Sequence, residues 1–105
     1  MKDGIVIREC NFELIENISK TPDVCVMELN KGQAIKEHTH GNSMYFAKNV
    51  KFLTVNGRDY ELPRFSWVFI PEGLSHGWRG VFDSGFNGEV FSYHSNHKEY
   101  SLVSV

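Results

Sequence analysis

Two histidines separated by one residue, His38 and His40, are the side chains in this sequence whose spacing first suggests chemistry. Side chains on a β-strand alternate between faces, so residues i and i+2 project from the same face. Two imidazoles placed in this way can bind one metal ion at about 2.0–2.2 Å. The pair alone is a weak signal, because this spacing also arises by chance on solvated strands. A metal site therefore requires further ligands elsewhere in the chain.

A third histidine, His76, follows an apolar strand and a tight turn. The strand is expected at residues 66–70 and is followed by Pro71 and Gly73. Proline fixes φ and glycine permits positive φ, so these two residues can reverse the chain sharply and aim the next strand. His76 begins that strand. Trp78, two residues further on, shares its face and is predicted to line the same pocket.

The elements that must position these histidines are short strands. Glycine, asparagine and proline recur at short intervals, which is typical of all-β sandwiches and barrels. Asn56-Gly57 is expected to form a two-residue type I′ hairpin turn, because both residues tolerate positive φ. Residues 12–20 are compatible with a helical turn or a strand, and residues 44–55 with one or two strands that break near Lys48-Asn49. The remaining strands are expected at 4–8, 24–29, 33–40, 58–62, 66–70, 75–82 and 89–95.

Length and composition predict one all-β domain spanning residues 1–105. Closure into a small barrel or sandwich would remove exposed strand edges. The net charge of −2 comes from interspersed acids and bases, which argues against a nucleic-acid surface. No apolar run approaches the roughly 18 residues of a membrane span, and the N-terminal segment lacks a signal-peptide core, so we expect a cytoplasmic protein. Cys10 and Cys25 form no CxxC pair and are expected to be free, buried thiols, although one disulfide remains open.

The segment from Gly32 through five residues to His38 and His40 resembles the first half of the first cupin motif, G(X)5HXH(X)3,4E(X)6G. The segment PEGLSH, which ends at His76, resembles the PXG(X)2H of the second cupin motif. The resemblance covers residues 32–80. It implies a small double-stranded β-helix, or jelly-roll, barrel in which the three histidines converge on iron, manganese, zinc, nickel or copper.

The sequence departs from the cupin pattern at the glutamate ligand. That position falls on Met44 or Tyr45, or on Asn42 if Tyr45 is matched to the family's strand tyrosine. None of these is an acid. The glycine that closes the first motif is replaced by Asn49 or Lys51. The resemblance thus implies a neutral three-histidine site whose fourth position is open to Asn42, Met44 or water, which suits a catalytic metal.

Four other titratable residues were weighed as site members. Glu37 is the acid nearest to the histidine pair, but it should face the opposite side of the strand. Tyr45 is a candidate general acid, with core packing as the alternative. His94 and His97 are interpreted as a solvated strand end rather than as metal ligands.

Two functions are compatible with this sequence. The first is a metal-dependent enzyme that acts on a small oxygenated substrate as a dioxygenase, isomerase or lyase. The alternative is a barrel that binds a sugar-like small molecule without catalysis, with or without metal. A purely structural ion is a third interpretation. The resemblance also suggests a homodimer, in which residues 4–8 pair with the sheet of a partner subunit.

Overall fold

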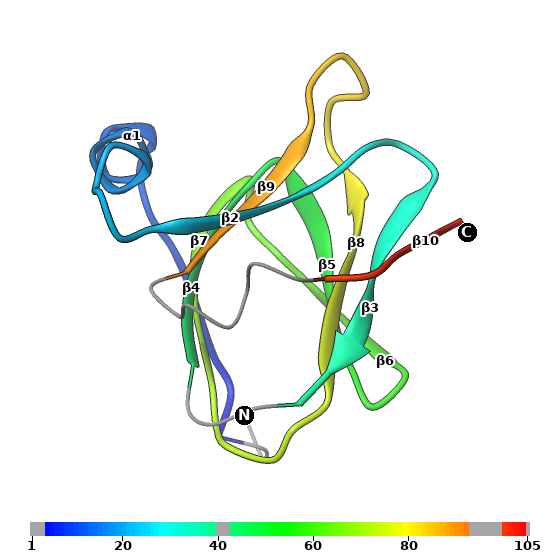
Figure 1. Cartoon of the computed structure of the whole chain (residues 1–105). Coiled ribbons are helices and arrows are strands. Elements are labelled where there is room, and N and C mark those ends of the chain that lie inside the picture. The colour runs from blue at the N-terminus through cyan, green and yellow to red at the C-terminus, as the bar shows by residue number, and fades with distance from the viewer. Residues whose placement is uncertain (1–3, 40–42, 93–99, 105) are drawn as a thin grey trace.

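The computed structural model describes residues 4–39, 43–92 and 100–104 (Figure 1). Within these ranges, one short helix and ten strands follow one another, so the predicted all-β class is confirmed. The elements are β1 (Val6–Glu9), α1 (Phe12–Ser19), β2 (Cys25–Leu29), β3 (Gln33–His38), β4 (Ser43–Lys48), β5 (Val50–Val55), β6 (Arg58–Glu61), β7 (Phe65–Ile70), β8 (His76–Val81), β9 (Gly88–Ser92) and β10 (Leu102–Ser104).

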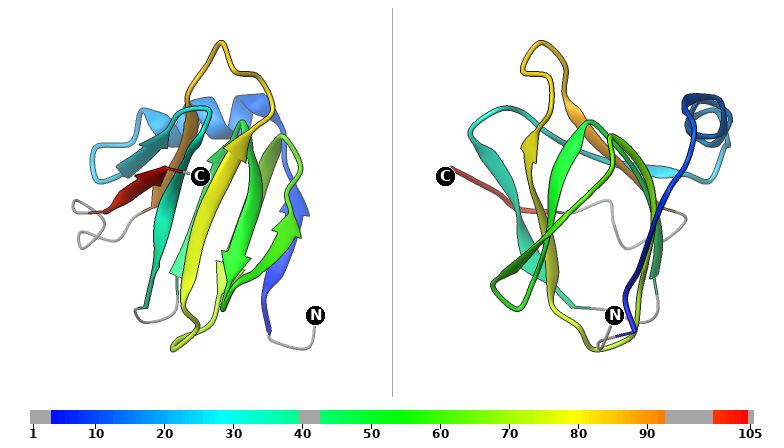
Figure 2. Two further views of the ribbon diagram at one scale, coloured as in Figure 1. Left: turned by 90° about the vertical axis from the view of Figure 1, so that its right-hand side faces the viewer. Right: turned by 180° about the vertical axis from the view of Figure 1, so that it is seen from behind.

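The strands form two antiparallel sheets that pack face to face (Figure 2). One sheet has the order β1-β7-β4-β9-β2 and the other has the order β10-β3-β8-β5-β6. Apart from the β5–β6 hairpin, every connection from β2 onward crosses from one sheet to the other. No strand pairing among the described residues joins the two sheets. Of the two forms predicted from the number of strands, a barrel or a sandwich, the fold is therefore the open two-sheet sandwich, and the closed barrel that the cupin resemblance implies is not formed.

Apolar side chains from both sheets fill the space between the layers. Strand β7 illustrates the pattern, since Val68 and Ile70 are buried in this core while Phe65 and Trp67 face the other side. The largest buried members of the core are Met27, Leu29, Ile35, Tyr45, Leu53, Ile70 and Trp78. Burial of each such side chain contributes about 1.5–3 kcal/mol, so this layer is the main source of stability.

Helix α1 covers the outer face of the sheet that contains β4 and β9 (Figure 1). The Asn11 side chain caps its first turn by accepting a hydrogen bond from the Leu14 amide at 2.8 Å. Ile15 and Ile18 are buried against Phe46 and Phe91. The ambiguous segment 12–20 is therefore a helix, because its apolar residues follow the helical period once the asparagine cap fixes the start. At eight residues this helix is too short to cross a bilayer, and no candidate span occurs in the described ranges.

Two turns follow the sequence prediction closely. Asn56 and Gly57 both have positive φ, at 49° and 79°, and join Val55 to Arg58 as the predicted hairpin. The chain breaks at Asn49, which has a φ of 62° and separates β4 from β5. Asparagine is one of the few residues that adopt this left-handed conformation at modest cost.

The N-terminal strand β1 pairs with β7 of its own chain and forms one edge of its sheet. A homodimer that uses this edge stays a prediction. Cys10 and Cys25 are free thiols, as predicted, but both are half-buried rather than fully buried.

Candidate functional site

Two of the three predicted metal ligands face each other on neighbouring strands. His38 ends β3 and His76 begins β8, and the two residues are directly paired in the sheet. Their ring centroids are 4.7 Å apart. The third predicted ligand, His40, lies outside the described residues, as do Asn42, His94 and His97. The structure therefore brings together the histidine pair that no single sequence motif contains.

A bulge in β3 brings His38 into register with His76 on β8. Ile35 pairs with Trp78 and His38 with His76, so β3 has one more residue than β8 between these two pairs. Gly77 lies opposite the bulge. A Cβ atom at this position would lie 2.4 Å from the carbonyl oxygen of Ile35, so only glycine permits this approach. The HGW sequence thus places a glycine where the two strands come closest.

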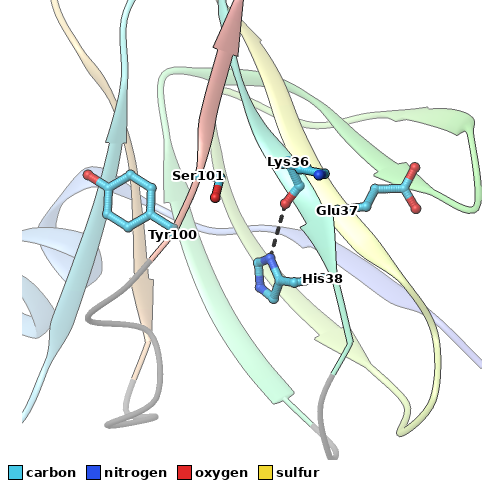
Figure 3. A pocket seen from close by; sticks show the side chains of 5 residues that line it. All are labelled: Lys36, Glu37, His38, Tyr100 and Ser101. Carbon is cyan, nitrogen blue, oxygen red and sulfur yellow. Dashed lines mark hydrogen bonds between the residues drawn. The ribbon is translucent and has the colours of Figure 1, made fainter.

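Both imidazoles are oriented by backbone carbonyl groups. The Nδ1 atom of His76 lies 2.8 Å from the Leu74 oxygen, and that of His38 lies 3.2 Å from the Lys36 oxygen (Figure 3). A carbonyl oxygen only accepts hydrogen bonds, so Nδ1 carries the proton in each neutral ring and Nε2 keeps its lone pair. Metal-binding histidines are commonly held in this way by a second hydrogen bond. In both rings Nε2 is therefore the nitrogen whose lone pair can accept a hydrogen bond or bind an ion.

Tyr45 completes the described part of this cluster. Its side chain is fully buried, and its hydroxyl lies 2.8 Å from Nε2 of His76. Since Nδ1 of His76 holds the ring proton, the hydroxyl donates to Nε2. Burial raises the pKa of Tyr45 far above its usual range, against a smaller opposing effect of a hydrogen bond from Ser43. Tyr45 therefore keeps its proton at neutral pH and acts as a hydrogen-bond donor.

The two neighbouring positions predicted for the missing glutamate have different environments. Met44 is 40% exposed, whereas Tyr45 on the opposite face of β4 is fully buried beside His76. Trp78, predicted to line the pocket, is fully buried in the core and packs edge-on against Tyr45, with ring centroids 5.1 Å apart. Tyr45 thus links the core to the histidine pair.

Glu37 points away from His38, as strand alternation predicts (Figure 3). Its carboxylate accepts hydrogen bonds from the amides of Asn56 and Gly57, each at 3.0 Å, and from the Ser75 hydroxyl at 2.9 Å. It therefore fastens the β5–β6 turn to the bulged part of β3. This role of Glu37 was not predicted. The Asn-Gly turn indicates amides that need an acceptor, but the sequence does not indicate which residue supplies it.

A cavity of about 300 Å³ lies beside His38. Its walls come from the bulge of β3 and from the segment that leads into β10, where Ser101 accepts a hydrogen bond from the Lys36 amide at 2.8 Å. The lining residues are Lys36, Glu37, His38, Tyr100 and Ser101 (Figure 3). Sequence reasoning missed Tyr100 and Ser101, because strand alternation gives no information on which strand the C-terminal segment joins. The cavity is large enough for a small molecule.

Within residues 4–39, 43–92 and 100–104, no three His, Cys, Asp or Glu side chains form a group that could hold a metal ion. The described part of the cluster is a pair of histidines with a tyrosine. Comparisons of the chain with protein-family models, with curated proteins and with solved structures gave no match.

Proposed function

We propose that this chain is a metal-binding jelly-roll protein of the cupin type and an enzyme that acts on a small oxygenated substrate. His38, His40 and His76 would hold the metal ion. The observation that carries the proposal is the pairing of His38 with His76 on neighbouring strands, with each Nδ1 bonded to a backbone carbonyl oxygen that fixes the orientation of the ring. Such fixed orientation is what a metal site requires of its histidines.

The order of the strands supports the jelly-roll part of the proposal. Eight of them divide into two antiparallel groups, β2-β9-β4-β7 and β3-β8-β5-β6, with β1 and β10 added at the edges. Two four-stranded sheets connected by repeated crossings are expected of a double-sheet jelly roll, the architecture to which cupins belong.

The departure from the cupin motif at its closing glycine is compatible with this fold. Asn49, one of the two residues matched to that position together with Lys51, adopts the positive φ that a glycine would supply. Its side chain also donates to the carbonyl oxygens of Asp83 and Phe86 and accepts from the Asp83 amide. The substitution therefore keeps the backbone conformation and adds an anchor for the loop before β9.

The donor chemistry suits zinc, copper, nickel or ferrous iron, because neutral imidazoles bind these ions better than magnesium or calcium. When bound, such an ion would polarise a substrate oxygen or activate a water molecule. The cavity beside His38 gives a small molecule room to approach, and Lys36 in its wall favours an anionic or oxygen-rich ligand. These residues bind and orient the substrate in the proposal, while the reaction type stays open among oxygenation, isomerisation and elimination.

Elemental analysis of protein made without a polyhistidine tag tests the proposal. We expect close to one metal ion per chain in the parent and little in His76→Ala and His40→Ala. His97→Ala is the matched control, since it removes a histidine that the proposed site does not use, and it should keep its metal. Circular dichroism spectra would establish that each variant is folded.

A parent protein that takes up no zinc, iron, nickel or copper on reconstitution would refute the metal centre. The second candidate, a metal-free protein that binds a sugar-like ligand, would then be favoured. Its supporting observation is the cavity beside His38, which Tyr100 and Ser101 line together with the histidine.

A further inference from the structure

We propose that the Tyr45 hydroxyl blocks the metal-binding nitrogen of His76, so that a metal ion must displace it to bind. This inference rests on the proposed metal site and adds a device that controls the affinity of the site. Tyr45 is then a positioning residue whose hydroxyl occupies Nε2 of His76 in the metal-free protein.

Competition follows from the valence of the imidazole ring. Nδ1 of His76 donates its proton to the Leu74 oxygen at 2.8 Å, which leaves one lone pair, on Nε2. The Tyr45 hydroxyl lies 2.8 Å from Nε2 and uses that lone pair as its acceptor. One lone pair cannot bind a hydrogen and a metal ion together. The two partners therefore exclude each other at this atom.

The surroundings of Tyr45 make the blocked state stable. Tyr45 and His76 are both buried, at 0% and 1% exposure, so water cannot easily replace either partner. The tyrosine ring packs edge-on against His76 on one side and Trp78 on the other, with centroids 5.5 Å and 5.1 Å apart. A buried hydroxyl that loses its acceptor also costs free energy. Metal binding must therefore overcome both the hydrogen bond and the tight packing of the ring.

Ser43 offers the displaced hydroxyl another partner. It lies two residues before Tyr45 on β4, is buried, and hydrogen-bonds the Tyr45 hydroxyl. Turning the Tyr45 hydroxyl hydrogen toward the Ser43 oxygen would end the hydrogen bond to Nε2, and the tyrosine oxygen must also move away to leave room for the ion. The serine hydroxyl, which can accept as well as donate, is thus a second partner for the displaced Tyr45 hydroxyl.

The test compares metal affinities, with cobalt(II) followed by its visible absorption and zinc(II) by competition with a coloured chelator. Tyr45→Phe removes the competing hydroxyl and should bind both ions about three- to tenfold more tightly, the range expected for one net hydrogen bond. Ser43→Ala removes the alternative acceptor and should bind more weakly. Tyr60→Phe, which removes a hydroxyl on β6, is the control and should match the parent. Nitrogen-15 spectra of the metal-free protein should show a shifted His76 Nε2 signal in Tyr45→Phe.

The outcomes separate this inference from the metal site itself. If His76→Ala abolishes binding while Tyr45→Phe binds equally or more weakly than the parent, the metal site stands and the blocking role is overturned. Binding by both proteins that is about three- to tenfold tighter in Tyr45→Phe would support the inference. Absence of binding in both parent and Tyr45→Phe would overturn the inference together with the metal site. Thermal unfolding of each folded variant would exclude loss of structure as the cause of weak binding.

Discussion

Replacement of Gly77 by alanine should lower the stability of the protein, because Gly77 lies where β3 and β8 come closest. The added Cβ would lie 2.4 Å from the Ile35 carbonyl oxygen and 3.0 Å from the Glu37 amide nitrogen. Carbon–oxygen contacts are ordinarily about 3.3 Å or longer, so the two strands must separate by about 1 Å. Both opposing atoms belong to the backbone of the bulge, which cannot turn aside as a side chain would.

The magnitude follows from this geometry. Overpacking of a well-packed site costs typically about 1–3 kcal/mol, and a backbone obstacle places Gly77→Ala at the upper end. Reduced freedom of the unfolded chain returns about 0.4–1 kcal/mol. The net loss of about 2–3 kcal/mol should lower the melting temperature by roughly 10–20 °C in a domain of this size. Since His38 and His76 flank the bulge, metal affinity should fall as well.

Thermal and urea unfolding of Gly77→Ala beside Gly85→Ala would measure the effect. Gly85 lies in the loop before β9 and has no positive φ, and its added Cβ would meet only a carboxylate oxygen of Asp83 at 3.2 Å. It should change stability by less than about 0.5 kcal/mol. A Gly77→Ala protein as stable as this control would refute the argument that the bulge requires glycine.

Three further changes test other contacts. Glu37→Gln removes the charge that receives the amides of residues 56–57 and should cost about 1–2 kcal/mol in urea unfolding, with shifted amide signals from that turn. Asn49→Gly keeps the positive φ but loses the side-chain anchor of the loop before β9, so it should cost about 2–3 kcal/mol, and Asn49→Ala about 1 kcal/mol more. Hydrogen bonds from Arg79 lower the pKa of Asp59, so this pair stabilises the fold above the unfolded pKa and loses that effect as pH falls through the folded value. Asp59→Asn should therefore make the melting temperature depend less on pH in the acid range. The free energy of unfolding lost should be less than about 1 kcal/mol, because the pair is partly exposed.

Local signals in the sequence were sufficient for many elements of the fold. The Asn56-Gly57 hairpin, the break at Asn49 and the strand that begins at His76 follow from backbone preferences that act over a few residues. The pairing of His38 with His76 required more, because the two lie 38 positions apart in the sequence. It was expected only through the resemblance, and the geometry of the described pair agrees with that expectation.

Features that depend on the register and pairing of strands could not be predicted. Strand alternation placed Glu37 on the face opposite His38, but the sequence does not show that the 56–57 turn folds back onto that face of β3. The number of strands was compatible with a barrel or a sandwich and the resemblance implied a barrel, whereas the pairing of the strands gives two separate sheets. The segment of Tyr100 and Ser101 joins the edge at β3, and no periodicity in its own residues indicates that partner.

Tyr45 is one of the positions onto which the cupin glutamate would fall, and a tyrosine there has a different physical effect from a carboxylate. A carboxylate there would only accept hydrogen bonds and would add negative charge beside the histidines. Tyr45 instead donates a hydrogen bond and stays neutral, because its burial opposes ionisation. The tyrosine therefore stabilises the metal-free protein through its hydrogen bond to His76. A carboxylate at the same position would instead stabilise the metal-bound protein. Tyr45→Glu should reverse this balance, with a lower melting temperature in metal-free protein and a larger rise on adding zinc(II) than the parent shows. Equal rises in the two proteins would contradict this account of position 45.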